Sequence, residues 1–279
     1  MRSMTETETN RSELETLLES MLSLLADGKT DEAKLISDEI LDRSRSGPDR
    51  DHTIEARVRI ERALIGLVPM DDIGRELRWC VDRLNAISSG SSIHGLALLN
   101  LATWHANRGE LMMSLATHSE ISVNNGHPLD IKSLSRIEVG RILSSMEDYG
   151  PAMRHLWSAR SGFLELGMVP ESIAASLEWL DLALDDIEVG SPRMSAILER
   201  ASPREGPGNT NNPSNPDDIV DVVEYLFPLL STDLSGYSRI DLGLILEASQ
   251  KIDAPVWRNV LMARKNEIQD RRVLEELQS

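Results

Sequence analysis

The chain is poor in aromatic residues, which make up 4% of it, and it contains one cysteine, Cys80. A single thiol cannot form an intrachain disulfide or a zinc knuckle, so neither kind of cross-link is expected to hold the fold. No apolar run approaches the roughly 20 residues that span a bilayer, and the polar, acidic start of the chain has no hydrophobic signal core. These absences predict a cytoplasmic protein without membrane contact.

Positive charge is also scarce, with 29 Lys and Arg against 46 Asp and Glu, a formal net charge of −17 and a pI near 4.8. Such a chain repels a phosphate backbone, and no basic patch is visible to compensate, so nucleic acid is excluded as an expected partner. Acidic residues are dense between Glu165 and Glu188. This face either steers a partner of basic character or keeps the protein soluble.

Sequence patterns typical of α-helices are abundant in the chain. Apolar side chains recur at spacings of three and four, Gly and Pro interrupt them, and alternation typical of strands is absent, which predicts an all-α fold. Five hairpins followed by three further helices are expected. Their ranges are 12–25 with 29–41, 53–67 with 72–87, 93–107 with 112–123, 135–146 with 152–166, 170–186 with 193–201, and then 217–230, 238–252 and a last helix from 255 towards 277.

A small residue stands early in the second helix of each expected hairpin, where it would let two helices approach closely. These residues are Ala33, Gly74, Ser114, Ala152 and Ser195, with separations of 41, 40, 38 and 43. A period near 40 residues predicts a solenoid of stacked hairpins. The alternative is an irregular helical bundle whose hairpins have similar lengths.

In the stretch from Glu138 to Ala159, Gly140 lies in the first helix, residues 147–149 form the turn, and Ala152 and Ala159 are small residues seven apart in the second helix. This stretch resembles a tetratricopeptide repeat. The spacing exceeds that family's usual 34 residues, and its aromatic positions are here mostly Leu, His or polar. The resemblance implies a right-handed superhelical array of antiparallel hairpins, with a concave groove lined mainly by first helices.

The resemblance also implies a non-enzymatic scaffold or adaptor that holds a protein or peptide segment in this groove, without a cofactor or a metal. Polar residues on the first helices are then the expected lining, and Asn side chains suit a peptide backbone because they both donate and accept hydrogen bonds. The expected lining residues are Arg62, Asn100, Thr103, Asn107, Glu138, Arg141, Glu178 and Asp185. They are equally the polar face of ordinary surface helices.

Composition divides the chain into four segments. Residues 1–11 are expected to be a flexible tail and residues 12–201 the repeat array. The Pro-, Asn- and Gly-rich residues 202–216 are expected to form a flexible loop or linker. Residues 217–279 would form either a sixth hairpin with a capping helix or a small separate unit.

One motif offers an enzymatic alternative. Asp217, Asp218 and Asp221 spell the DDxxD pattern with which all-α isoprenoid synthases hold Mg²⁺ and a diphosphate, and on a helix Asp217 or Asp218 shares a face with Asp221. The structural interpretation is that acidic residues begin a helix after a linker, where the helix dipole favours them. A third hypothesis is a sensory or oligomerisation module whose effector domain is a separate chain.

The six histidines show no pair at the three- or four-residue spacing of a helical metal site. His105 and His118 lie on the two helices of one hairpin and are the pair placed to meet across it. Cys80 is expected to be a small core residue, and no nucleophile or phosphate-loop motif is present. We therefore expect no catalytic, cofactor-binding or metal-ligating residues.

Overall fold

The structure is a computed structural model that describes residues 2–46, 50–200, 213–234 and 239–278. Within these ranges it contains 14 α-helices, 77% helix in all, and no β-strand beyond an isolated bridge between Ile187 and Ser214. The all-α prediction is therefore confirmed. None of the described helices is both long enough and apolar enough to span a bilayer.

The chain divides into two compact units, Met1–Lys132 and Ser133–Ser279. This boundary lies inside the predicted array of residues 12–201, whereas the sequence predicted a loop or linker at 202–216 and left open whether the helices after it continue the array. The reason is the distribution of burial, since one hydrophobic cluster ends at Ile131 and another begins at Ile137. Residues 201–212, most of the predicted linker, lie outside the described residues.

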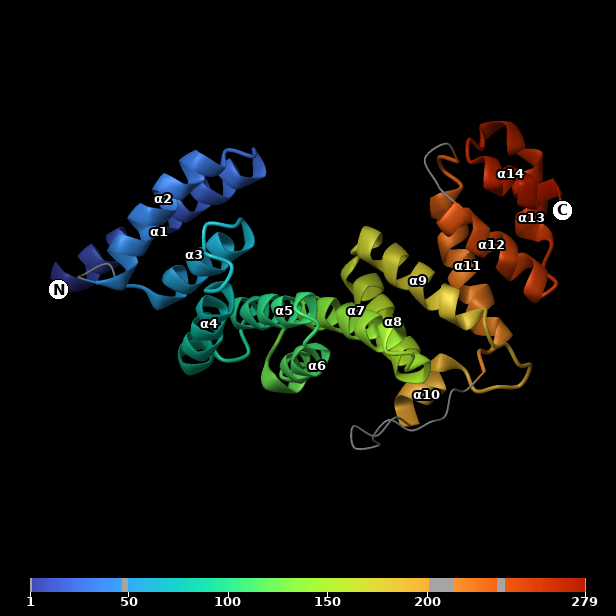
Figure 1. The fold of residues 1–279 in the computed structure, drawn as a ribbon, viewed down its shortest axis with the longest axis horizontal. Helices are drawn as coiled ribbons and strands as arrows, with labels where there is room; N and C mark the ends of the chain where they lie inside the picture. Colours follow the sequence, from blue (N-terminus) through green and yellow to red (C-terminus); the bar gives the residue numbers. More distant parts are fainter. Residues whose placement is uncertain (1, 47–49, 201–212, 235–238, 279) are drawn as a thin grey trace. The chain divides into compact units, whose positions relative to one another are not determined.

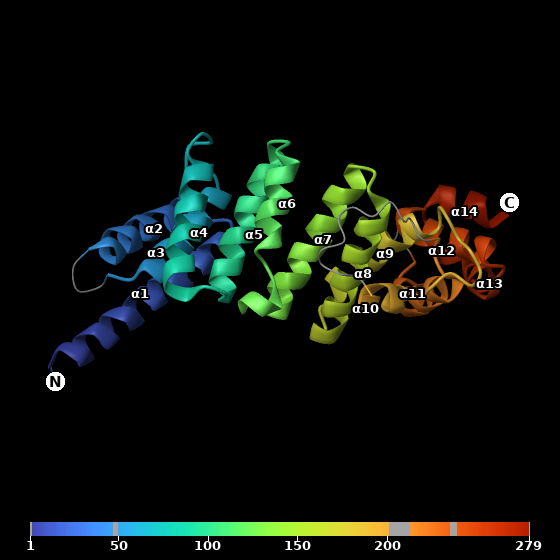
Figure 2. The ribbon, with the colours of Figure 1, turned by 90° about the horizontal axis from the view of Figure 1, so that it is seen from below.

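The first unit is a series of helices in which each packs on the next along the chain (Figures 1 and 2). The helices are α1 (Arg2–Ala26), α2 (Thr30–Arg45), α3 (His52–Leu64), α4 (Ile73–Ser88), α5 (Ser92–Asn107) and α6 (Leu111–Ser119). Helix α1 begins at Arg2, so residues 2–11 are helical where the sequence predicted a tail. No Gly or Pro interrupts residues 2–26, and the helix continues through the polar stretch.

Two hydrophobic clusters hold the first unit together. One joins α1, α2 and α3 around Leu14, Met21 and Ile40, and the other joins α3, α4 and α5 around Ile60 and Leu84.

Small residues are buried in this unit, but the close approach at Gly74 is to the following hairpin and not, as the sequence predicted, between the two helices of its own hairpin. Ala33, Gly74 and Ser114 are buried, and a Cβ at Gly74 would lie 2.4 Å from ring atoms of Trp104 on α5. Gly74 is therefore needed where α4 meets α5.

The second unit has a different packing order. Its helices are α7 (Leu129–Ser145), whose first four residues precede the boundary, α8 (Tyr149–Leu166), α9 (Val169–Ala183), α10 (Met194–Arg200), α11 (Pro216–Leu230), α12 (Arg239–Lys251), α13 (Val256–Ala263) and α14 (Arg271–Gln278). Helix α9 packs on α8, α11 and α12, while α10 packs on α8. The predicted hairpin of 170–186 with 193–201 is therefore not observed as a packed pair among the described residues. Ser195 is exposed, so the prediction that it mediates close packing was wrong.

The C-terminal helices belong to the core of the second unit. A single buried cluster extends from Ile137 to Leu277 and includes Trp179, so these helices are not a separate domain. The predicted continuous last helix is interrupted after Ala263. Asp270 then caps α14, where its side chain accepts hydrogen bonds from the backbone N–H groups of Arg272 and Val273 at 2.8 and 3.4 Å.

Candidate binding cleft

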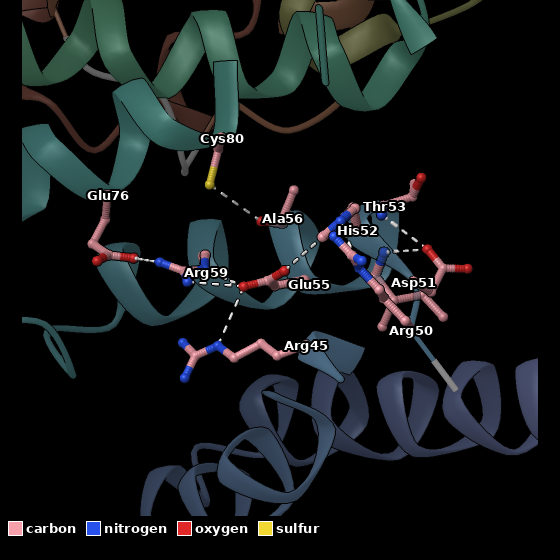
Figure 3. A network of polar contacts seen from close by, with 11 residues as sticks. Arg45, Arg50, Asp51, His52, Thr53, Glu55, Ala56, Arg59, Glu76 and Cys80 are labelled. Carbon is pink, nitrogen blue, oxygen red and sulfur yellow. Dashed lines mark hydrogen bonds and ion pairs between the residues drawn. The ribbon is translucent and has the colours of Figure 1, made fainter. Parts of the chain in front are cut away.

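A buried carboxylate organises the polar interior of the first unit. Asp51 caps α3, since its side chain accepts from the backbone N–H groups of Thr53 at 2.9 Å and Ile54 at 3.1 Å. One turn further on, Glu55 is only 2% exposed and is surrounded by cationic and polar side chains (Figure 3). A charge buried to this extent needs partners for each oxygen.

Side chains from two helices supply those partners. Arg59 donates to Glu55 from Nε at 3.0 Å and from Nη2 at 2.8 Å, Arg45 donates at 3.2 Å, and His52 Nδ1 lies 3.0 Å away. Arg59 also donates from Nη1 to Glu76 on α4 at 2.5 Å. Burial opposes ionisation of Glu55, but the hydrogen bonds from His52 and Arg59 outweigh it and hold the pKa of Glu55 below its usual value.

Arg59 and Cys80 extend this network to α4. The Arg59 guanidinium lies 4.1 Å from the centroid of the Trp79 ring, a cation–π arrangement. Cys80 donates its thiol to the carbonyl of Ala56 at 3.6 Å, and burial raises the pKa of this thiol to about 12. The prediction that Cys80 is a buried core residue is confirmed, and its pKa makes it a poor nucleophile.

A hollow of about 370 Å³ lies beside this network, between α2, α3 and α4, and we call it the polar cleft. Arg59 and Glu76 form part of its wall, so the buried network fixes their positions. Its lining is mostly charged, with a smaller apolar part. The lining residues are Asp38, Leu41, Asp42, Arg45, Arg59, Arg62, Leu67, Val68, Pro69, Asp72 and Glu76.

The charges of the polar cleft leave specific groups free for a ligand. Arg62 uses Nη1 to bind Ser37 at 2.6 Å and Asp38 at 2.5 Å. The Arg45 side chain is 48% exposed beyond its contact with Glu55, and Asp42 is exposed without an ion pair among the described residues. Four carboxylates against three arginines give the lining an excess of negative charge. The cleft therefore favours a ligand group that is positively charged.

Of these lining residues, the sequence predicted only Arg62. The others were not predicted because the cleft depends on side chains from three helices that meet only in the folded unit. One signal was present, since Glu55 and Arg59 stand four residues apart on a predicted helix. It could not show that Glu55 is buried.

The other expected lining residues of the first unit do not contribute to this cleft. Asn100 donates to the carbonyl of Leu96 at 2.8 Å, within its own helix, while Thr103 and Asn107 are exposed on α5. These three residues are thus positioned on the helix surface, away from the lining of the polar cleft.

In the second unit, three expected lining residues meet in one ion-pair cluster. Arg141 on α7 donates to Glu178 on α9, with Nη2 at 2.6 Å, and to Glu138 at 2.5 Å. These hydrogen bonds and charges, with Glu178 the largest contributor, raise the pKa of Arg141. Asp185 is exposed, and its charge adds to burial in raising the pKa of Asp181. Both arginines of the expected groove, Arg62 and Arg141, therefore already have carboxylate partners.

The DDxxD residues converge on one arginine. Arg193 contacts Asp217 at 3.4 Å, Asp218 at 2.5 Å from Nε, and also Asp221. Asp218 is 2% exposed and accepts a further hydrogen bond of 2.6 Å from the backbone N–H of Met194 at the start of α10. This is the environment of a structural carboxylate that joins α10 to α11, and it favours the structural interpretation of the motif.

A histidine pair that the sequence did not single out meets in the structure. His105 Nδ1 lies 2.6 Å from Glu110, whereas His127 Nε2 lies 3.2 Å from His94 Nδ1 in a buried pair of stacked rings. The backbone N–H of Gly90 also donates to His94 Nδ1, at 3.2 Å, so the hydrogen-bond pattern assigns His94 as neutral with its proton on Nε2. Among the described residues, no group of three or more His, Cys, Asp or Glu side chains is arranged to hold a metal ion.

The His94 pair should make the protein less stable in mild acid. Burial, with a smaller contribution from the charge of His127, lowers the pKa of His94. The unfolded chain, with a histidine pKa of about 6.5, then binds the proton more readily, so stability falls as pH drops below that value. We expect the melting temperature to fall less between about pH 7 and 5.5 in His94→Gln than in the wild type. Equal pH slopes for the two proteins would refute this assignment.

Comparison of the sequence with protein-family models and with curated proteins finds no match. What the structure defines is therefore a class, an all-α protein whose helices pack mainly on their neighbours along the chain.

Proposed function

We propose that this protein is a non-enzymatic scaffold that binds a segment of another protein in the polar cleft, with its helices forming a tetratricopeptide-like array. The observation that carries the proposal is the cleft itself. It is an open hollow with charged groups on three helices, held in position by the buried Glu55 network. Preorganised charges of this kind lower the cost of binding because they are already ordered.

The chemistry of the lining indicates what the segment carries. Asp42 has no ion pair within the described residues and the lining is negative overall, so a lysine or arginine side chain of the partner is the complementary group. The exposed Arg45 guanidinium can pair with a carboxylate or carbonyl beside it. The expected groove residues Glu138, Arg141, Glu178 and Asp185 remain candidates for partner binding on the second unit by itself.

The experiment compares two charge reversals by quantitative affinity capture from native lysate. Asp42→Lys reverses a charge in the cleft, and Asp31→Lys reverses an exposed charge on the same helix outside the lining. The proposal predicts proteins that the wild type and Asp31→Lys both capture and that Asp42→Lys captures at least roughly tenfold less, a loss of about 1.4 kcal/mol. Capture profiles that do not differ between Asp42→Lys and the wild type would overturn it.

A further inference from the structure

A second hollow in the first unit has aromatic walls. It has a volume of about 450 Å³ and lies along α4, and we call it the tryptophan groove. The groove is separate from the polar cleft and uses another face of α4. Its lining residues are Asp71, Gly74, Arg75, Arg78, Trp79, Asp82 and Trp104.

The two tryptophans are held firmly in place. Trp79 lies under the Arg59 guanidinium at 4.1 Å, and Arg59 is itself fixed by Glu55 and Glu76. Trp104 packs so closely on Gly74 that a Cβ there would overlap its ring, and Arg108 lies 5.0 Å from its centroid. Rigid, partly exposed tryptophans are the side chains that most often anchor binding interfaces.

The hydrogen-bonding groups of this groove are mostly donors. Neither indole N–H, of Trp79 or of Trp104, donates to another group within the part of the chain that the structure describes. Arg78 is exposed there without an ion pair, and Arg75 has only a contact of 3.0 Å with Asp72. An indole offers one donor and a guanidinium five, so the matching ligand is rich in acceptors.

We infer that the tryptophan groove binds a proline-rich segment of a partner protein in the polyproline II conformation, flanked by a lysine or arginine. Such a segment has no internal hydrogen bonds, so its carbonyl groups are free to accept, and its prolines bring no N–H donor. A helical ligand would have used its carbonyls internally, and a β-strand would bring backbone N–H groups that the two tryptophans and two arginines of the lining cannot accept.

Dimensions and charge agree with this ligand. Gly74 and Asp82 are eight positions apart, about 12 Å along a helix at 1.5 Å per residue, which a polyproline II segment covers with about four residues. Asp71, just before α4, and Asp82, on α4, both line the groove and have no ion pair among the described residues. They are the complementary charges for basic residues at the ends of the segment.

The test is selection of a random peptide library on the immobilised protein, followed by NMR of the five indole N–H signals with the best selected peptide. We expect spaced prolines with a flanking Lys or Arg to be enriched, and only the Trp79 and Trp104 signals to shift. Trp79→Phe and Trp104→Phe keep an aromatic ring and remove the donor, so each should weaken binding roughly three- to tenfold. Circular dichroism would confirm that both variants remain folded.

Two controls show whether the peptide binds in the tryptophan groove and whether its prolines are required. Asp42→Lys should leave the peptide affinity unchanged, so that failure of the polar cleft and failure of the tryptophan groove are distinguishable. A peptide in which Gly and Ser replace the prolines, with the same basic flanks, should bind much more weakly. The inference is overturned if that peptide binds equally well, if selected sequences lack proline, or if the signals of the other three tryptophans shift instead.

Discussion

Replacing Glu55 with glutamine is expected to lower the free energy of unfolding by roughly 3 to 5 kcal/mol. The carboxylate is 2% exposed and accepts hydrogen bonds from Arg59 and Arg45. Glutamine has nearly the same shape, but it removes the charge and turns an amide N–H₂ towards donors. Arg59, half-buried beside Trp79, then keeps only Glu76 as a counter-charge.

Chemical denaturation followed by helical circular dichroism measures this loss. Glu39→Gln is the matched control, because Glu39 pairs with Arg43 at 3.9 Å on the exposed surface of the same unit. Such a pair contributes less than about 1 kcal/mol. If the Glu55 and Glu39 variants were destabilised equally, Glu55 would not be the residue that organises the cleft.

The second large effect is expected at Asp218. Asp218→Asn should cost roughly 3 kcal/mol without any metal present, because the side chain is buried and joins Arg193 to the N-terminus of α10. Asp217→Asn is the control, since its side chain is 76% exposed and lies 3.4 Å from the same arginine, and its cost should stay below about 1 kcal/mol.

This pair of variants also discriminates between the two interpretations of the DDxxD motif. Carboxylates that form a Mg²⁺ site repel one another when the metal is absent. Neutralising one of them would then leave the free energy of unfolding unchanged or increase it. A stabilised Asp218→Asn variant, together with a wild-type melting temperature that rises with Mg²⁺ and a diphosphate, would contradict the structural assignment.

The helices were predictable because their signals are local. The spacing of apolar residues and the positions of Gly and Pro predicted most helix boundaries to within a few residues, including those of α3, α5 and α8. The errors occurred where local signals were weak or misleading. Helix α7 begins at Leu129, directly after Pro128, rather than at Ser135, which is buried inside it. The break between α13 and α14 was missed because charged residues there suit a helix surface as well as a turn.

The candidate site was less predictable because it depends on burial and on contacts between helices. The expected groove residues were the polar residues on one face of the first helices. A sequence pattern does not distinguish an arginine that is free to bind a partner from one that already forms an ion pair within the protein. In the structure, Arg62 forms an ion pair with Asp38, and Arg141 forms one with Glu178. Glu55 was missed because its four-residue spacing from Arg59 does not show burial, and a buried glutamate and a surface glutamate look alike in one sequence.

Site-specific photo-crosslinking from position 42 tests the central claim most directly. A photoreactive amino acid at Asp42 would stand in the polar cleft, and the same residue at Asp31 would stand on α2 outside it. If the polar cleft binds a partner protein, cross-linking in native lysate should give a defined cross-linked polypeptide from position 42 that is absent from position 31 and that an excess of unmodified wild-type protein competes away. No cross-link at position 42, or the same products from both positions, would contradict that claim.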